Sequence, residues 1–223
     1  MTTATTAKHA DHELKDAVER ELEWAANVEA DRIGVAVHDR TVTLSGEVGT
    51  YPEKLAATRA ALRVRGVTAL ADELSVDLPW RRDDVDIARD AATALERSAV
   101  VPDGAVKATV HDHVVTLSGS VPWDYQRRAA IQAVTTLRGV RDVRSEIAIK
   151  PTAIISPDKA RAKITSAIMR NAQLQANQID PLVNGTEITL TGTVSSWAAR
   201  RQAEHAAWAV PGVTKVRNLL RLV

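Results

Sequence analysis

The chain has 223 residues, with 29 Lys and Arg against 28 Asp and Glu and no cysteine, which excludes disulfides, thiolate metal sites and cysteine nucleophiles. Five Trp and two Tyr are the only aromatic residues, so any core is built from aliphatic side chains and alanine. No stretch approaches the roughly 20 apolar residues that span a bilayer, and the N-terminal "MTTATTAKHADHELK" lacks the apolar run of a signal peptide. We therefore expect a cytoplasmic protein, with an envelope location only if a leader has been removed.

The first predicted element is a helix near the N-terminus. Residues 1–10 show no apolar pattern and are predicted to be disordered. After them Leu14, Val18 and Leu22 recur every four residues, which places one apolar stripe along a helix. The same segment, "DHELKDAVERELEWAANVEAD", is strongly acidic on its other positions.

A predicted hairpin and a second helix follow. Ile33, Val35 and Val37 alternate with smaller or polar residues, and a short polar turn, "HDR", leads into the strand "VTLSGEV" at residues 42–48. A helix with several alanines then runs to "RGV", where Gly66 is a typical helix stop. Leu74 and Val76 mark a last strand. The predicted order is therefore α-β-β-α-β.

This order repeats twice more along the chain. The strand recurs as "VTLSGSV" and "ITLTGTV", and its glycines, Gly46, Gly119 and Gly192, lie 73 residues apart. The helix stop recurs at the same interval as Gly66, Gly139 and Gly212. Two markers at one period predict three tandem copies of a small domain. We assign residues 11–78, 84–150 and 157–223 to the three domains. The predicted fold class is α+β, with three αββαβ domains, each a three-stranded mixed sheet with two helices packed on one face.

The later copies show the same apolar pattern with small differences. Their first helices carry Ile87, Ala91 and Leu95 in the second copy and Ile164 and Ile168 in the third. In the third copy Pro181 interrupts the first strand, which predicts an irregular or edge strand because proline cannot donate to a ladder.

The repeated glycine falls where strand alternation predicts a buried side chain. A glycine there leaves a hole and costs backbone entropy. We expect it to face the alanines of the second helix, Ala57 and Ala60 in the first copy, so that helix and strand approach closely.

The pattern of a "VTLSGSV"-type strand, an alanine-rich helix, "GV" and a "VxNxL" tail resembles the BON domain, a bacterial module of osmotic-stress and envelope proteins. The third copy carries the tail most fully in "GVTKVRNLLRLV", with Asn218 where the first two copies have Asp72 and Ser145. The resemblance implies an αββαβ fold, phospholipid or membrane-surface binding, and no catalysis. Some relatives are also linked to small-ion binding.

Charge is distributed unevenly over the three copies. Residues 11–80 hold 8 Lys and Arg against 14 Asp and Glu, a net charge of −6. Residues 81–153 hold 11 against 10, and residues 154–223 hold 9 against 4, a net +5. The three copies share one fold but differ in net charge, which suggests a separate task for each copy or head-to-tail contact between molecules.

The start of the second helix is the leading candidate for a binding site in copies two and three. There an aromatic side chain precedes two arginines by about one turn: Trp123, Arg127 and Arg128 in the second copy, and Trp197, Arg200 and Arg201 in the third. Tryptophan favours membrane interfaces and arginine binds phosphate. The alternative is that the aromatic is a hydrophobic staple and the arginines are solvated. Asp124 and Ser196 are the predicted N-caps.

No other pattern indicates a reactive site. His111 and His113 flank Asp112 in a predicted turn, but a third metal ligand is not evident, and we assign no metal, cofactor or catalytic residue. The catalytic motifs GxSxG, HExxH, GxGxxG and the P-loop are absent from the sequence. Nucleic-acid binding is not expected, because no stacking platform accompanies the basic residues.

Two functions remain open on this basis. The first is a non-catalytic, peripheral protein that binds anionic phospholipid at a membrane surface during stress or envelope maintenance. The second is a scaffold for protein–protein contact or self-association, in which the acidic first copy meets a basic partner. Small-ion binding is a lesser alternative.

Overall fold

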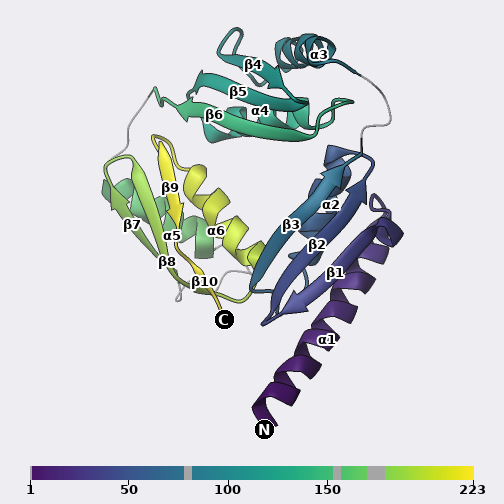
Figure 1. Ribbon diagram of the computed structural model, residues 1–223. Helices are drawn as coiled ribbons and strands as arrows, with labels where there is room; N and C mark the ends of the chain where they lie inside the picture. Colours follow the sequence, from purple (N-terminus) through teal and green to yellow (C-terminus); the bar gives the residue numbers. More distant parts are fainter. Residues whose placement is uncertain (1, 78–81, 153–156, 170–178) are drawn as a thin grey trace. The chain divides into compact units, whose positions relative to one another are not determined.

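The computed structural model describes residues 2–77, 82–152, 157–169 and 179–223 (Figure 1). It contains three separate sheets, with strand orders β1-β2-β3, β4-β5-β6 and β7-β8-β9, and β10 also pairs with β8. Each sheet is accompanied by helices from its own part of the chain. The predicted α+β class with three αββαβ units is therefore confirmed.

The first domain shows how the chain order produces a mixed sheet. Strand β2 is central, antiparallel to β1 and parallel to β3. The parallel pairing requires a crossover connection, which helix α2 supplies. The elements are α1 (Thr2–Glu23), a 3-10 turn (Ala30–Arg32), β1 (Ile33–His38), β2 (Thr41–Val48), α2 (Tyr51–Ala61) and β3 (Ala69–Val76).

The other two domains repeat this plan. The second consists of α3 (Asp84–Glu96), β4 (Val106–His111), β5 (Val114–Val121), α4 (Asp124–Thr135) and β6 (Asp142–Ile149). The third consists of α5 (Pro157–Met169), β7 (Ile179–Asn184), β8 (Glu187–Val194), α6 (Trp197–Trp208), β9 (Lys215–Asn218) and β10 (Arg221–Leu222). Pro181 lies in β7, which is an edge strand as predicted. The side chain of Ile168 is outside the described residues.

The core of each domain lies between one sheet face and the helices. In the first domain the helix stripe of Leu14, Val18 and Leu22 is buried, as are Val42 and Leu44 on the facing strand. The third domain has the corresponding cluster, and the described buried residues in it are all alanine, valine, leucine or isoleucine. Residues on the opposite sheet face are exposed or half-buried, so each sheet has one face that its own helices do not cover.

The N-terminal helix is longer than the sequence predicted. Helix α1 begins at Thr2, so residues 2–10, predicted to be disordered, are helical in the structure. Neither glycine nor proline interrupts this segment. His9 lies 3.2 Å from Glu13 in an i,i+4 pair that continues the helix surface toward the acidic region.

The repeated glycine has a different neighbour from the one predicted. Gly46 has φ +119° and Gly119 has φ +128°, a conformation that side-chain-bearing residues rarely adopt. A Cβ atom would lie 2.2 Å from the carbonyl oxygen of Arg32 at Gly46, and 2.1 Å from that of Ala105 at Gly119. The expectation that helix alanines fill the space is therefore wrong. The backbone that enters the neighbouring strand occupies it instead.

The hairpin turns of the first two domains depend on a carboxylate in the first helix. Asp39 and Arg40 both have positive φ, as a two-residue type I′ turn requires. Asp11 accepts hydrogen bonds from both of their backbone N–H groups, at 2.9 and 3.0 Å. Asp84 binds the next turn in the same way at Asp112 and His113. The third copy has Pro157 at this position and Gly185, which tolerates positive φ, in the turn.

Replacing Asp11 with alanine should therefore destabilise the first domain. The turn N–H groups are exposed and water can replace the carboxylate, so the expected loss is about 1 kcal/mol in the free energy of unfolding. Urea unfolding checks this value, with Asp11→Asn as a control that retains one acceptor. Equal stability of Asp11→Ala and the parent would contradict the assignment.

Candidate binding surfaces

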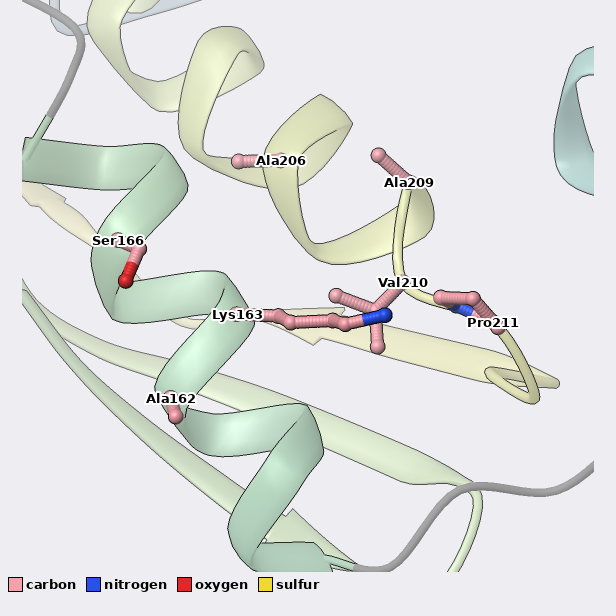
Figure 2. A pocket seen from close by; sticks show the side chains of 7 residues that line it. All are labelled: Ala162, Lys163, Ser166, Ala206, Ala209, Val210 and Pro211. Atoms are coloured by element: carbon pink, nitrogen blue, oxygen red, sulfur yellow. The ribbon is translucent and has the colours of Figure 1, made fainter.

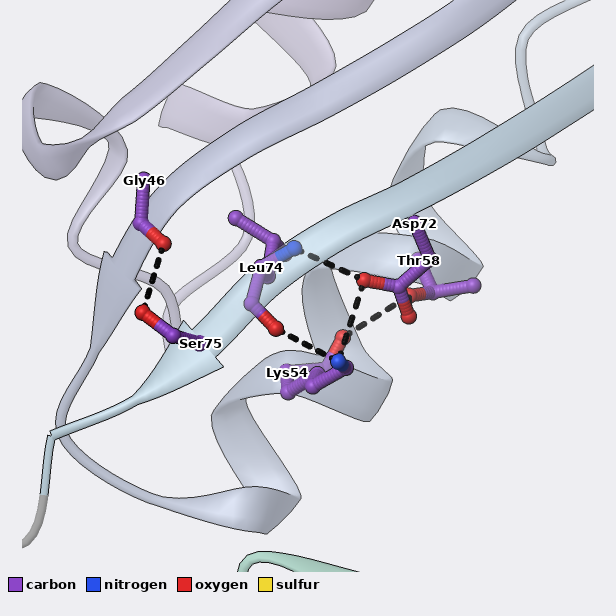
Figure 3. Close-up of polar contacts among 6 residues, drawn as sticks. All are labelled: Gly46, Lys54, Thr58, Asp72, Leu74 and Ser75. Atoms are coloured by element: carbon purple, nitrogen blue, oxygen red, sulfur yellow. Dashed lines mark hydrogen bonds and ion pairs between the residues drawn. The ribbon is translucent and has the colours of Figure 1, made fainter.

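In the first domain a polar cluster ties the second helix to the last strand (Figure 3). Lys54 of α2 donates to the carbonyl oxygen of Leu74 at 2.5 Å, and its Nζ lies 3.3 Å from Asp72 Oδ1. The hydroxyl of Thr58 donates to Asp72 Oδ2 at 3.3 Å. Asp72 points to the helix side of β3, so its charge is used within the domain.

The third domain has different residues in the same three positions. Asn218 Nδ2 donates to the carbonyl oxygen of Arg200 and to Glu204 Oε2, both at 3.1 Å. In return Arg200 Nη2 donates to the carbonyl oxygen of Asn218 at 2.8 Å. The Arg200 guanidinium also lies over the Trp197 ring, 5.0 Å from its centroid. Arg200 and Trp197, two of the predicted site residues, thus contact one another, and Arg200 also ties α6 to β9.

The arginines of the second domain pair with their own helix. Both Arg127 and Arg128 contact the carboxylate of Asp124, and the Nε of Arg128 lies 2.9 Å from Asp124 Oδ2. The Asp124 side chain is only 3% exposed, whereas that of Arg128 is 48% exposed. Two guanidinium groups share one carboxylate, so this corner of the domain retains a net positive charge.

An exposed tyrosine beside Trp123 was missed in the sequence. The Trp123 and Tyr125 rings stack with their centroids 6.4 Å apart, and Tyr125 is 52% exposed. Tyr125 follows Asp124 in the first turn of α4, where its ring points outward. The signal in the sequence is a second aromatic residue two positions after Trp123, which lies outside the aromatic–arginine spacing shared by the two copies.

The predicted helix caps are partly correct. Ser196 is the N-cap of α6 and accepts from the Ala199 N–H at 3.1 Å. Asp124 is already the first residue of α4, so it lies one position inside the helix. The N–H of Trp123 is instead bound by the Gln126 side chain at 3.2 Å.

The six predicted site residues thus divide into two groups. Arg200, Arg127, Trp197 and Trp123 make contacts within their domains, through the bonds and rings described above. Arg128 projects half of its side chain into solvent, and Arg201 is half-buried with no ion pair in the described part of the chain. The structure therefore leaves Arg128 and Arg201 as the arginines with most freedom to meet a ligand.

A shallow groove opens between the two helices of the third domain (Figure 2). Its volume is about 530 Å³, and most of its lining is alanine, valine and proline. Lys163 extends across it from α5 toward Val210. In the first domain an ion pair between Glu21 of α1 and Arg63, two residues beyond the end of α2, lies near the corresponding place, with the charged atoms 2.8 Å apart. Ala209 of the groove occupies the repeat position of Arg63, and Lys163 is the one charged residue among the described lining residues.

One group of carboxylate and imidazole side chains has metal-ligand character. Asp11, His38 and Asp39 have ligand atoms within 4.8 Å of one another. Both carboxylate oxygens of Asp11 already accept the backbone N–H groups of the hairpin turn, which accounts for its position.

The three-fold αββαβ repeat matches a known domain family. The profile of the BON domain matches residues 10–77, 83–151 and 157–223. The chain belongs to the BON domain family. The matched segments cover each of the three sheets with its helices, and they support the resemblance found in the sequence.

A curated relative with BON domains is the osmotically-inducible protein Y of Escherichia coli strain K12. It is 32% identical to this chain over 130 residues, which are 56% of this chain and 65% of the relative. The match with this BON protein therefore covers less than two thirds of that relative's length. Two solved structures of CdsD, a structural protein of the type III secretion system of Chlamydia trachomatis, have 12% and 11% identity and a TM-score of 0.27. They cover 95% and 94% of this chain, and 92% and 97% of their own.

Among the described residues of this BON protein, none of the helices combines the length and apolar character needed to cross a bilayer.

Proposed function

We propose that this BON protein is a non-catalytic binding protein whose second and third domains attach peripherally to anionic phospholipid. The observation that carries the proposal is the corner at the start of α4. There the exposed Tyr125 ring stacks on Trp123 beside the half-exposed Arg128. An amphipathic aromatic next to a cation suits the headgroup region of a membrane.

The charge of the domains supports the same proposal. Residues 154–223 carry a net +5 and residues 81–153 a net +1, whereas residues 11–80 carry −6 and would be repelled. A cation near an anionic surface contributes about 1 kcal/mol. Because Asp124 neutralises part of the charge on Arg127 and Arg128, binding should be weak, reversible and sensitive to salt. The name of the E. coli relative links that protein to osmotic induction, and we extend a role in osmotic stress to this chain as part of the proposal.

Co-sedimentation with liposomes tests this function. The parent should pellet with vesicles that contain anionic lipid, should remain in solution with zwitterionic vesicles, and should be released as salt shortens the Debye length below about 8 Å. Reversing Arg128 and Arg201 together, as Arg128→Glu with Arg201→Glu, should lower the apparent affinity by about tenfold or more. Arg200 is left intact because its contacts hold α6 to β9.

A matched control distinguishes a local binding site from an effect of the overall net charge. Arg65→Glu with Arg97→Glu changes the net charge by the same amount at two exposed positions outside the helix starts. This control should bind almost as well as the parent. A parent that ignores anionic vesicles would overturn the proposed function. If both double variants lost liposome binding equally, only net charge would matter. The corner at the start of α4 would then not be the binding site.

A further inference from the structure

The uncovered sheet face of the third domain combines apolar and basic side chains. Leu182 of β7 is 53% exposed, and Leu219, between β9 and β10, is 60% exposed. The strand register places Leu182, Thr189 and Arg217 in one row across the sheet. Leu219 follows Asn218, which faces α6, so Leu219 lies on the opposite face. Two large apolar side chains thus lie on a sheet face that the helices of this domain leave uncovered.

The cations of this face lie on the strands beside the leucines. Lys215, Arg217 and Arg221 occupy alternate positions along the last strands and all are exposed. Glu187 lies 3.7 Å from Lys215 and 3.8 Å from Arg217, so it compensates part of their charge. Arg221 has no ion pair among the residues described. The face therefore carries one leucine at each edge of the sheet, threonines on the central strand β8 and an excess of positive charge along β9 and β10, while Asp180 of β7 adds one carboxylate in the row of Thr191.

The uncovered face of the first domain has the opposite character. Its rows consist of small side chains, with Ala36, Thr43 and Ala71 in one row and Gly34 and Ser45 in the next. Glu73 continues that second row, and Glu47 and Asp77 lie toward the same end. Arg32 lies 3.9 Å from Glu47 and 3.7 Å from Asp77, whereas Glu73 has no ion pair within the described ranges. This surface carries small side chains and an excess of negative charge.

The second domain provides an internal comparison. Thr109 and Glu146 occupy the positions that match Leu182 and Leu219, and Ala148 matches Arg221. The apolar and basic combination is therefore absent from the corresponding face of the second domain. It is a property of the third copy and not of the repeated fold.

We propose that the uncovered sheet face of the third domain docks on the uncovered sheet face of the first domain in a second copy of this chain. Sheets pack face to face about 10 Å apart, with side chains from both faces filling the space. The small residues around Ala36 leave room for Leu182 and Leu219, and the cations meet Glu47, Glu73 and Asp77. The contact joins two different surfaces, so it leaves one free face of each kind and can propagate from molecule to molecule.

The area of the two sheet faces determines how strong their contact is expected to be. Three strands about 4.8 Å apart and some six residues long present roughly 300 Å² on each side. The total of about 600 Å² is well below the roughly 1,200 Å² at which stable interfaces begin, so the contact is expected to be weak and transient. Self-association should therefore appear at high protein concentration and weaken as salt screens the charges.

Charge reversal on one face at a time tests the contact. Sedimentation velocity of the full chain without lipid should show concentration-dependent association of the parent at low salt. Glu73→Arg alters only the first-domain face, and Arg221→Glu alters only the third-domain face. Each variant alone should associate about tenfold more weakly, because every contact would contain one altered face. An equimolar mixture should regain association, since unaltered faces are then present on different molecules.

Glu146→Arg is the matched control, because it makes the same change at the position of the second domain that corresponds to Glu73. It should associate as the parent does. A second variant, Leu182→Ser with Leu219→Ser, should also weaken association without changing charge. A parent that stays monomeric at every salt and protein concentration would overturn the proposal. So would single variants that associate like the parent, or a mixture that shows no recovery. Because lipid is absent, these outcomes are independent of the vesicle experiment.

Discussion

Gly119→Val is expected to unfold the second domain. The new Cβ would lie 2.1 Å from the carbonyl oxygen of Ala105, and backbone atoms cannot move aside as the end of a flexible side chain can. The residue must also keep φ near +128°, where a β-branched side chain is strained. Overpacking and backbone strain each cost about 1 to 3 kcal/mol, so together they approach the whole stability of a small domain.

Hydrogen exchange of the β5 amides measures this effect within the three-domain chain, where a single unfolding transition is not assured. Gly104→Ala provides the matched control in the same domain. Gly104 also has positive φ, but a Cβ there would meet nothing within 4 Å. It should therefore cost only about 1 to 2 kcal/mol from its conformation. Protection of β5 in Gly119→Val equal to that in the parent would contradict the role given to the carbonyl of Ala105.

The second large effect is expected for Glu53→Ala in the first domain. One carboxylate oxygen of Glu53 accepts the N–H of Glu29 at 2.8 Å, and the other accepts the N–H of Gly49 at 2.9 Å. Glu53 is also the third residue of α2, where its own N–H donates to the N-cap Thr50. Alanine would leave two partly buried backbone donors without this acceptor. Each hydrogen bond to a charged group contributes roughly 1.5 to 3 kcal/mol, and water can reach these part-buried donors, so the expected loss is about 2 to 4 kcal/mol, less than the sum of the two bonds.

Urea unfolding followed with amide exchange at Glu29 and Gly49 checks this value. Glu53→Gln is the control, since the corresponding residue of the second domain is Gln126, whose side-chain oxygen accepts the Trp123 N–H. The glutamine variant retains one acceptor and should lose less than half as much stability as the alanine variant. If both variants were as stable as the parent, the loop around Glu29 would not depend on this carboxylate.

Most of the fold could be predicted because apolar periodicity and turn residues are local signals. Leu14, Val18 and Leu22 fixed the buried side of α1, and the recurrence of Gly46 at an interval of 73 residues fixed the number of domains. The neighbour of that glycine could not be predicted. It is the backbone carbonyl of the residue directly before the neighbouring strand of the hairpin. The alternation of side chains within one strand carries no information about that contact.

Fewer contacts of the candidate site could be predicted from the sequence. Spacing correctly placed Trp197 near Arg200, but it could not show that Arg200 binds the carbonyl of Asn218. That bond depends on which strand passes the helix. The uncovered faces were missed for another reason. Leu182 and Leu219 lie far apart in the sequence and share a surface only once the register of β7, β8 and β9 is known.

The contacts between the second helix and the last strand also bear on how three similar domains fold in one chain. Tandem domains with the same plan risk exchanging equivalent segments during folding. If α6 packed against β3, Glu204 would approach Asp72, two like charges at the place where Asn218 normally donates to Glu204. If α2 packed against β9, Lys54 would lose the ion pair that it makes with Asp72. Because of these differences between the repeats, each helix packs most favourably on the strand of its own domain. The same differences disfavour the exchange of segments between neighbouring domains in the newly made chain.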